Sequence, residues 1–402
     1  MKKQNRINFN SQKELSNYLL EALGGNMKQA IKATIELMLK AEMTQLRSEL
    51  EEKLEEREKL YFNGYYNRHL LSPVGHIENV EIPRFRGGNE HMPIQGLQLF
   101  EDEAARFYQL IFEMHQRGVS QQKIREICME YFKKPVSKGK IGKVYAELVQ
   151  REEFQINEQE LDDEFEYLYI DGIWNKVFTF RLDGESNKMV MLCVLGVRKD
   201  GSRKLLGFEL AKAEDYSSWF KLLSCVKRRG LHGKNLKLIV SDGAEGGLKA
   251  LSEIYPRAEI QLCISHKSRN VLSKCPHKHK AAMAEDLKEI YKANSLEEAK
   301  ELCKQFERNW FIEAEKSVSS LKHRFELYFT YFKFPRAIWT AIRTTNLLER
   351  EFREVRRRTK VFDNYFKSPK SAEKYHNGIF TYLNNHYPLK NSLTKKFQQI
   401  TH

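Results

Sequence analysis

The spacing of apolar and polar residues divides the chain into regions of different secondary structure. Residues 11–60 have helical spacing, which predicts either solvated helices with one buried stripe or a dimerising helix pair. Alternation over 76–82 predicts a short strand or hairpin, followed by a basic and aromatic loop at 83–86. Helical spacing returns over 101–149. The first 150 residues are therefore predicted to be mainly helical, with one small β element.

Within the second helical region, two short helices are separated by a tight turn. Ser120 is a candidate N-cap for a helix over 121–131, and a second helix follows Pro135-Val136-Ser137. The second helix carries Lys138, Lys140 and Lys143. This arrangement fits a helix-turn-helix that docks on DNA, although the same pattern also occurs in unrelated helical bundles.

An acidic stretch then precedes a change of period. Residues 152–166 contain eight Asp or Glu, which predicts a hinge and domain boundary over 151–166. After it, the period drops to two and then alternates with helical spacing, which is typical of a mixed α/β sheet. The predicted strands are 165–171, 177–182, 189–197, 205–211, 236–241 and 259–263. The predicted helices are 216–229 (with Trp219, Leu222, Leu223 and Val226 as its buried stripe), 246–255, 266–272 and most of 277–342.

Composition narrows the class of partner. The 402 residues include 68 Lys or Arg and 54 Asp or Glu, a net charge of +14. Such an excess favours a polyanionic partner, with nucleic acid ahead of a membrane surface. No apolar run is long enough to span a membrane and no signal-peptide core follows Met1, and the 6 cysteines are too sparse for a disulfide framework. We therefore expect a protein of the reducing cytoplasm.

Two aspartates are well placed for metal chemistry. Asp171 and Asp242 each close an apolar strand and precede a glycine. If the two strands are neighbours, their ends lie about 5 Å apart. Carboxylates at that distance repel each other unless a divalent cation such as Mg²⁺ lies between them. The alternative for each is a plain Asp-Gly turn.

A third acid lies in the most basic segment. Residues 343–370 contain nine Lys or Arg and four Asp or Glu. Thr345 or Asn346 could cap a helix here, and helical spacing places Asn346, Glu349, Arg353 and Arg356 on one face. Such a face could ligate metal through the acid and clamp phosphates through the guanidiniums. The alternative is a solvated helix with Glu349–Arg353 and Glu354–Arg358 ion pairs.

Several motifs carry a family resemblance. DGIWNK at 171–176, VSDGAEGGLKAL at 240–251, LCISHKSRNV at 262–271 and TTNLLEREFREVRRRTK at 344–360 closely resemble the Mutator-type insertion-sequence transposases of bacteria, as do NGYYNRHL at 63–70, IPRFRGG at 82–88 and MHQRGVSQQKI at 114–124. The resemblance covers about residues 40–365. It implies an α/β fold with a ribonuclease H-like mixed-sheet core, an all-helical insertion and a mainly helical N-terminal DNA-binding region.

The resemblance also implies an activity. Asp171, Asp242 and Glu349 match the catalytic Asp-Asp-Glu triad, which is expected to hold two Mg²⁺, with Mn²⁺ as a substitute. The enzyme would bind terminal inverted repeats and target DNA, cleave and transfer DNA strands, and work as a homodimer or larger assembly at the nucleoid. The alternatives are a non-catalytic relic or repressor, and a ribonuclease H-like nuclease or resolvase.

A Cys-x-x-His element of the family matches Cys263 and His266. With Cys275, His277 and His279 nearby, these residues could form a zinc site. Four well-placed ligands are not evident, however, which disfavours zinc. A buried cysteine with a structural or phosphate-contacting histidine is the other interpretation.

These interpretations assign every segment of the chain a role. The predicted segments are N-terminal helices at 1–60, a DNA-binding region at 61–150, the acidic hinge at 151–166, the first part of the core at 167–276, the helical insertion at 277–342, and the core completion with a basic tail at 343–402. The predicted DNA contacts are Arg84, Arg86, Lys138, Lys140, Lys143, Arg353, Arg356, Arg357, Arg358 and Lys360.

Overall fold

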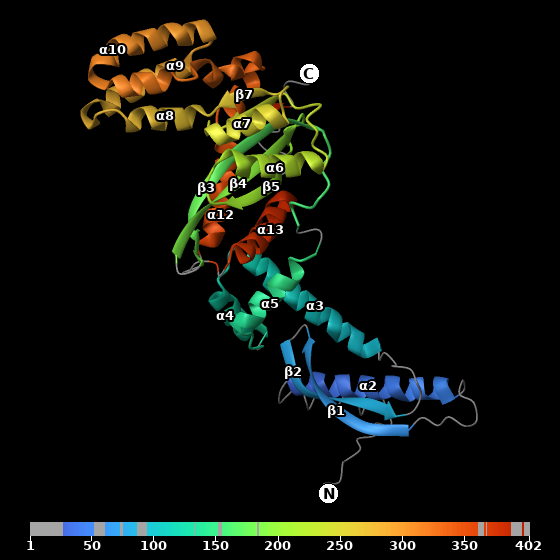
Figure 1. Cartoon of the computed structure of the whole chain (residues 1–402). Helices are drawn as coiled ribbons and strands as arrows, with labels where there is room; N and C mark the ends of the chain where they lie inside the picture. The colour runs from blue at the N-terminus through green and yellow to red at the C-terminus, as the bar shows by residue number, and fades with distance from the viewer. Residues whose placement is uncertain are drawn as a thin grey trace. The chain divides into compact units, whose positions relative to one another are not determined.

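The computed structural model forms two compact units (Figure 1), each treated by itself. It describes residues 27–51, 61–72, 75–86, 95–132, 134–151, 155–182, 185–360, 366, 368–386 and 396–397. The N-terminal unit comprises Met1–His115 and Val119–Tyr145, and the C-terminal unit comprises Gln116–Gly118 and Ala146–His402. Among the described residues, no helix is long and apolar enough to cross a membrane.

The N-terminal unit begins with a helix packed on a β-hairpin. Helix α2 (Met27–Glu51) covers β1 (Tyr61–Ser72) and β2 (Gly75–Arg86), which pair antiparallel. Their shared core includes Leu39, Ile77, Val80 and Ile82. Ile77, Val80 and Ile82 lie in the alternating run, so the prediction of a hairpin there is confirmed. Residues 11–26 and 52–60 of the predicted helical region lie outside the described residues.

Three further helices follow the hairpin. They are α3 (Gln95–Gln116), α4 (Gln121–Phe132) and α5 (Lys138–Leu148). The Ser120 hydroxyl accepts a hydrogen bond from the Lys123 backbone N–H at 3.3 Å, which confirms the predicted cap of α4. Ser137 caps α5 in the same way through the Lys140 N–H at 3.1 Å. The two short helices of the predicted helix-turn-helix therefore begin where their caps indicate.

The C-terminal unit is built on a mixed five-stranded sheet with the order β5-β4-β3-β6-β7. Its strands are β3 (Phe165–Leu182), β4 (Glu185–Arg198), β5 (Arg203–Ala211), β6 (Leu238–Ser241) and β7 (Glu259–Leu262). Strand β4 pairs antiparallel with both β3 and β5, whereas β6 pairs parallel with β3 and β7 pairs parallel with β6. The prediction of a mixed α/β sheet is confirmed. The predicted break between 171 and 177 is wrong, because β3 runs through it. A register shift between Trp174 and Thr179 accommodates these residues as a bulge.

Helices cover the sheet and extend beyond its β7 edge (Figure 1). Helix α6 (Tyr216–Arg228) buries the predicted stripe of Trp219, Leu222, Leu223 and Val226 and packs against α7 (Glu245–Ile254), β4 and β5. Helices α8 (Ile264–Ser273), α9 (Lys280–Lys292) and α10 (Leu296–Lys322) pack on one another. Short turns and α11 (Trp339–Ile342) lead to α12 (Asn346–Thr359), which packs on β3, and α13 (Pro369–His386) packs on β3 and β5.

The described part of the predicted hinge is packed into the C-terminal unit. Ile156 is 1% exposed, and Asn157 exchanges two hydrogen bonds with the backbone of Phe208. Asp163 accepts hydrogen bonds from the backbone N–H groups of Gly233 and Lys234. Residues 155–164 are thus fixed by specific polar partners, which a run of acids in the sequence does not reveal.

Candidate active site

Two neighbouring strands bring the predicted aspartates together. Strand β6 lies parallel to β3 with Ile170 opposite Ser241, so Asp171, within β3, lies beside Asp242, which follows the carboxyl end of β6. The prediction that these strands are neighbours is confirmed, and neighbouring strands lie about 4.8 Å apart. Asp171 is 4% exposed and accepts a hydrogen bond from the Gly172 N–H at 2.8 Å. Asp242 is half-buried and accepts one from the Ala244 N–H at 3.1 Å.

Helix α12 brings Glu349 to the same place. Potential ligand atoms of Asp171, His266 and Glu349 all lie within 4.8 Å of one another. A Glu349 carboxylate oxygen accepts a hydrogen bond from Arg269 at 3.0 Å and lies 3.9 Å from Nε2 of His266. The alternative Glu349–Arg353 pairing is therefore replaced by contacts to α8. The site combines one side chain from the sheet, two from α8 and one from α12.

Thr345 occupies the N-cap position of α12, as predicted, but its hydroxyl does not cap the helix. It lies 3.5 Å from Sγ of Cys263 and 3.5 Å from Nδ1 of His266. The Thr345 N–H also donates to Sγ of Cys263 at 3.4 Å. The Cys-x-x-His pair thus fixes the start of α12 and, through it, the position of Glu349. Two of the other residues considered for a zinc site have different partners: Cys275 contacts the Pro276 carbonyl, and His279 contacts Glu313.

The charges at the site are strongly coupled. Burial and repulsion by Asp242 raise the pKa of Asp171 to about 7, against opposing interactions with His266 and Thr345. Burial alone would lower the pKa of His266, but the hydrogen bond with Cys263 and the charge of Asp171 raise it to about 9. Burial alone would raise the pKa of the Cys263 thiol, yet its contacts with His266 lower it. At neutral pH, His266 is therefore a cation placed between two carboxyl groups.

The donor set fits a hard divalent cation. Asp171 and Glu349 supply carboxylate oxygens, which Mg²⁺ prefers, and Asp242 follows Asp171 on the neighbouring strand. Burial and the neighbouring Asp242 raise the pKa of Asp171, and a divalent cation would oppose both by stabilising the charged carboxylate. His266 is a further potential ligand once it is deprotonated.

One acid at this site was missed by sequence reasoning. Glu214 precedes α6, and its Oε1 accepts a hydrogen bond from Nε1 of Trp174 at 2.7 Å. A Cβ atom on Gly172 would lie only 2.7 Å from the same oxygen. Burial and repulsion by Asp242 raise the pKa of Glu214. The only sequence signal was an acid before a helix, which is also typical of a capping residue, and Asp215 performs that capping through the Ser218 N–H.

Most predicted DNA contacts lie on exposed surfaces. The exposed cations are Arg84, Lys138, Lys140, Lys143, Arg353, Arg356, Arg357 and Lys360, and Asn346 is exposed at the first position of α12. The side chain of Arg86 lies outside the described parts of the structure. Arg357 pairs with Glu354 at 3.0 Å.

Arg358 does not fit the prediction of a phosphate contact. It is 2% exposed, and its Nε donates to the Gln116 carbonyl at 2.9 Å. Its Nη1 pairs with Glu354, as the ion-pair alternative predicted, and its guanidinium lies 5.0 Å from the centre of the Tyr382 ring. The third arginine of the Arg356–Arg357–Arg358 run turns inward because consecutive residues on a helix point about 100° apart.

Comparisons with known proteins identify a family and several relatives. The family described as "Transposase, Mutator family" matches residues 1–389. The transposase for insertion sequence element ISRM5 of Rhizobium meliloti is 29% identical over 335 residues, which cover 83% of this chain and 82% of that protein. The transposase for IS905 of Lactococcus lactis is 28% identical and covers 78% of this chain and 77% of its own length. The transposase for IS6120 of Mycolicibacterium smegmatis is 38% identical over 199 residues, 49% of this chain and 59% of its own.

Proposed function

The chain belongs to the Mutator family of transposases, and from this premise we propose that it is a metal-dependent DNA transposase of the Asp-Asp-Glu type. It binds the terminal inverted repeats of an insertion sequence, cleaves DNA strands there and joins them to target DNA. The observation that carries the proposal is the convergence of Glu349 with Asp171, beside the strand that ends at Asp242.

The sheet supports a ribonuclease H-like core. Counted within the C-terminal unit, the five strands have the spatial order 3-2-1-4-5, and only the second runs antiparallel to the rest. The central strand and its parallel neighbour carry Asp171 and Asp242, so the two acids lie at a point where the sheet topology reverses. The α9–α11 region, between β7 and α12, corresponds to the helical insertion expected of such an enzyme.

The chain's own residues prepare the site for a negatively charged phosphodiester. Asp171, Asp242 and Glu349 hold the metal, and Arg269 fixes the Glu349 carboxylate at 3.0 Å. Two Mg²⁺ or Mn²⁺ ions bound there would activate the attacking water or 3′-hydroxyl and stabilise the leaving oxygen. His266, whose pKa is raised to about 9, places a positive charge beside the carboxylates.

A polar cleft supports binding of the DNA backbone next to these acids. It opens at Asp242 between α8 and α10, with a volume of about 760 Å³. Its lining includes Asn270, Lys274, Lys316 and Ser319 together with Glu315, while the ammonium of Lys267, which also lines it, donates to the carbonyls of Ser320 and His323. Glu245, which also lines the cleft, is paired with Arg324 at 2.7 Å. Ammonium, amide and hydroxyl donors of this kind bind phosphate oxygens without reading base sequence.

Recognition of the DNA end is assigned to the N-terminal unit. Helices α4 and α5 match in position the two helices of the predicted helix-turn-helix, and Lys138, Lys140 and Lys143 are exposed on α5. The second helix of such a motif enters the major groove. Because two ends must be brought together before joining, the active assembly contains at least two copies of the chain.

The decisive experiment uses the full-length chain and a labelled duplex that carries the terminal inverted repeat flanking its gene. With Mg²⁺ or Mn²⁺, the protein should nick this end and join it to a second duplex. An Asp171→Asn variant keeps the side-chain volume but removes the charge, so it should bind the end and produce neither product. A wild-type chain that binds the end yet never cleaves it would instead support a non-catalytic DNA-binding protein.

A further inference from the structure

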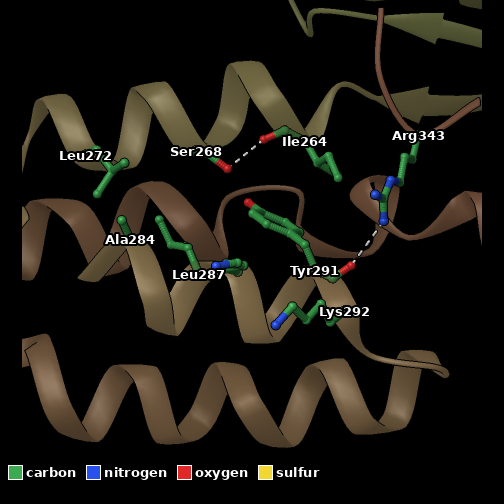
Figure 2. Close-up of a pocket in the computed structure, with 9 residues that line it drawn as sticks. Ile264, Ser268, Leu272, Ala284, Leu287, Tyr291, Lys292 and Arg343 are labelled. Atoms are coloured by element: carbon green, nitrogen blue, oxygen red, sulfur yellow. Dashed lines mark hydrogen bonds between the residues drawn. The ribbon is translucent and has the colours of Figure 1, made fainter. Parts of the chain in front are cut away.

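Helix α8 presents different side chains around its circumference. His266 and Arg269 point to the candidate active site. Ile264, Ser268 and Leu272, spaced four residues apart, line a separate cavity of about 380 Å³ between α8 and α9 (Figure 2). The remaining lining residues are Ala284, Leu287, Lys288, Tyr291 and Lys292 of α9 and Arg343, which precedes α12. Its volume lies within the range of small-molecule sites, about 300–1,000 Å³.

The floor of this cavity is apolar and rigid. Ile264 and Leu287 are 7% and 2% exposed, and Leu272 and Ala284 complete the apolar lining. These side chains belong to two helices that pack directly on each other. A flat apolar ligand would therefore meet a preformed surface, which reduces the entropy cost of binding.

Tyr291 places one polar group in this apolar lining. Its side chain is only 8% exposed, and among the described residues its hydroxyl makes no hydrogen bond. The hydroxyl is directed towards α8, on the side of Ser268 (Figure 2), whose own hydroxyl donates to the Ile264 carbonyl at 2.9 Å. A buried hydroxyl without a partner is unfavourable, because it has given up water without replacing it. This hydroxyl, covered by its neighbours and facing Ser268, is the buried polar group of the described lining that lacks a well-formed partner.

Cations surround the opening of the cavity. Arg343 donates to the Tyr291 carbonyl at 3.5 Å, a long hydrogen bond that leaves other guanidinium donors (Figure 2). Lys288 and Lys292 pair with Glu285 and Glu289 at 3.2 and 2.7 Å, but all four side chains are exposed. Such surface ion pairs are weak, so each lysine can exchange its glutamate for a phosphate group. An apolar floor with one hydroxyl, beneath three cations, matches a planar heterocycle attached to an anion.

We infer that this cavity receives an unpaired purine or pyrimidine base, whose phosphate is held by Arg343, Lys288 and Lys292. The inference rests on the proposed function, which places a DNA strand at the other side of α8. The two places are also joined through the backbone. The Ile264 N–H donates to the Arg343 carbonyl at 3.2 Å, and Thr345, two residues further on, contacts Cys263 and His266. A base leaving the duplex near the reacting strand would thus have a site in which to lodge.

The test fills the cavity without touching the active site. Ala284→Phe places a ring in the cavity, whereas Ala282→Phe adds the same ring at an exposed position of α9 that does not line it. Tyr291→Phe removes only the hydroxyl. Each full-length variant is given a terminal inverted-repeat duplex with one unpaired 5-iododeoxyuridine at its end, irradiated, and mapped by peptide mass spectrometry. Thermal unfolding of each variant verifies that it is folded.

The expected result is a crosslink within α9 at Tyr291. Ala284→Phe should reduce its yield at least about tenfold, and Ala282→Phe should leave it unchanged. Tyr291→Phe should weaken the preference for the unpaired over the fully paired end by about fivefold, the effect of one lost hydrogen bond. Equal yields in the two Ala→Phe variants, or a crosslink elsewhere, would overturn the inference.

A second arm separates the two sources of such a base. Millimolar deoxyadenosine monophosphate is added to the wild type and to Ala284→Phe without DNA. A rise in melting temperature confined to the wild type would identify a free nucleotide as the occupant. If neither the crosslinking experiment nor the melting experiment gives a response, the cavity binds no base and the inference is wrong. If the crosslinking result contradicts the inference but every variant still cleaves fully paired ends, only the inference has failed and the proposed function stands. Absence of cleavage in the wild type would instead count against the proposed function.

Discussion

Two basic helices, α5 and α12, look alike in sequence and differ in how they are built into their units. Helix α5 buries Ile141, Val144 and Tyr145, and all three of its lysines are exposed. Helix α12 buries half of its fourteen residues, among them Glu351 and Arg358. The difference teaches that a cation's role depends on whether its own side of the helix faces solvent or protein. The lysines of α5 are exposed to solvent, whereas Arg358 of α12 is buried in the fold.

The burial of α12 has a consequence for its active-site side chain. Glu351 lies 3.4 Å from Arg203 of β5, and the Tyr375 hydroxyl of α13 donates to the Arg358 carbonyl at 3.3 Å. These contacts, together with apolar packing by Phe352 and Val355, fix the helix on which Glu349 sits. A side chain on such a rigid element is held accurately enough for chemistry. The solvent-facing side of α5 has no comparable constraint and suits electrostatic binding.

The largest expected effect is therefore on catalysis and belongs to α12. Glu349→Gln should reduce strand cleavage by about a thousandfold or more, because the metal loses a charged ligand while the side chain keeps its size. Binding of the DNA end should be unchanged or tighter, since one negative charge near phosphate is removed. Cleavage and binding of the same labelled end are measured in parallel.

Glu354→Gln is the matched control for this substitution. Glu354 lies on the same helix but pairs with Arg357 and Arg358 rather than with α8. Cleavage by this variant should remain within a few fold of the wild type once its lower stability is taken into account. A loss of cleavage as large as that of Glu349→Gln would contradict the assignment of Glu349.

The second effect is on stability and concerns Arg358. Arg358→Met should lower the free energy of unfolding of the C-terminal unit by about 3 kcal/mol, because Glu354 and the Gln116 carbonyl each lose a buried partner. Arg357→Met, at a side chain that is 57% exposed, should change it by less than about 0.5 kcal/mol. Urea unfolding of both variants gives the comparison. Equal effects would mean that burial does not distinguish the two arginines.

The fold could be predicted from sequence where one period governs one element. The stripe of α6, the edge strands β5 and β7 and the hairpin alternation at Ile77, Val80 and Ile82 all lie where the pattern indicated. Strand β3 was predicted as two pieces because Gly172 and Asn175 are typical turn residues. Its pairing with β4 overrides that local preference, and the bulge after Trp174 accommodates the extra residues.

The site could be predicted only where a local motif marks it. Asp171, Asp242 and Glu349 each follow a recognisable local pattern; in the structure Asp171 and Glu349 lie together with His266, and Asp242 follows the strand next to Asp171. Glu214 lies in no such motif, and Arg269, although it lies in the motif at 262–271, was not singled out, because the contacts of these two residues are with neighbours 40 and 80 residues away in sequence. The inward turn of Arg358 was equally hidden, since three consecutive arginines are chemically identical until one face is covered.

The third effect is on stability at low pH and compares two buried histidines, one packed against α5 and one in α13. His115 packs edge-on against Tyr145 of α5, with ring centres 4.9 Å apart, and His376 lies within α13 among Phe208, Phe366 and Phe380. Burial lowers the pKa of each histidine to about 4. Because this is below the unfolded value of about 6.5, protons favour the unfolded state. Stability is fully present above about pH 6.5 and is lost as the pH falls towards 4.

Each histidine should therefore cost its unit about 3 kcal/mol between pH 7 and pH 4, at about 1.4 kcal/mol per pKa unit. His115→Gln and His376→Gln should each flatten the pH dependence of urea unfolding over this window, in the unit that holds the residue. A dependence that survives both buried substitutions would assign acid unfolding to other groups.

The smallest effect returns to α5 and is expected only in DNA binding. Lys138→Ala should weaken binding of the DNA end by about fivefold and reduce the slope of log affinity against log salt by about 0.9, the value for one released phosphate contact. Lys140→Ala should do the same and also remove the contact of its ammonium with the Tyr108 ring at 4.7 Å. Neither change should alter the rate of cleavage at saturating protein, because both lysines lie in the N-terminal unit. Binding is measured on the inverted repeat and on random duplex at several salt concentrations. An unchanged slope would move the phosphate contacts to Arg84 or to α12, and α5 would then be a solvated helix of a small bundle, as the alternative interpretation of its sequence allowed.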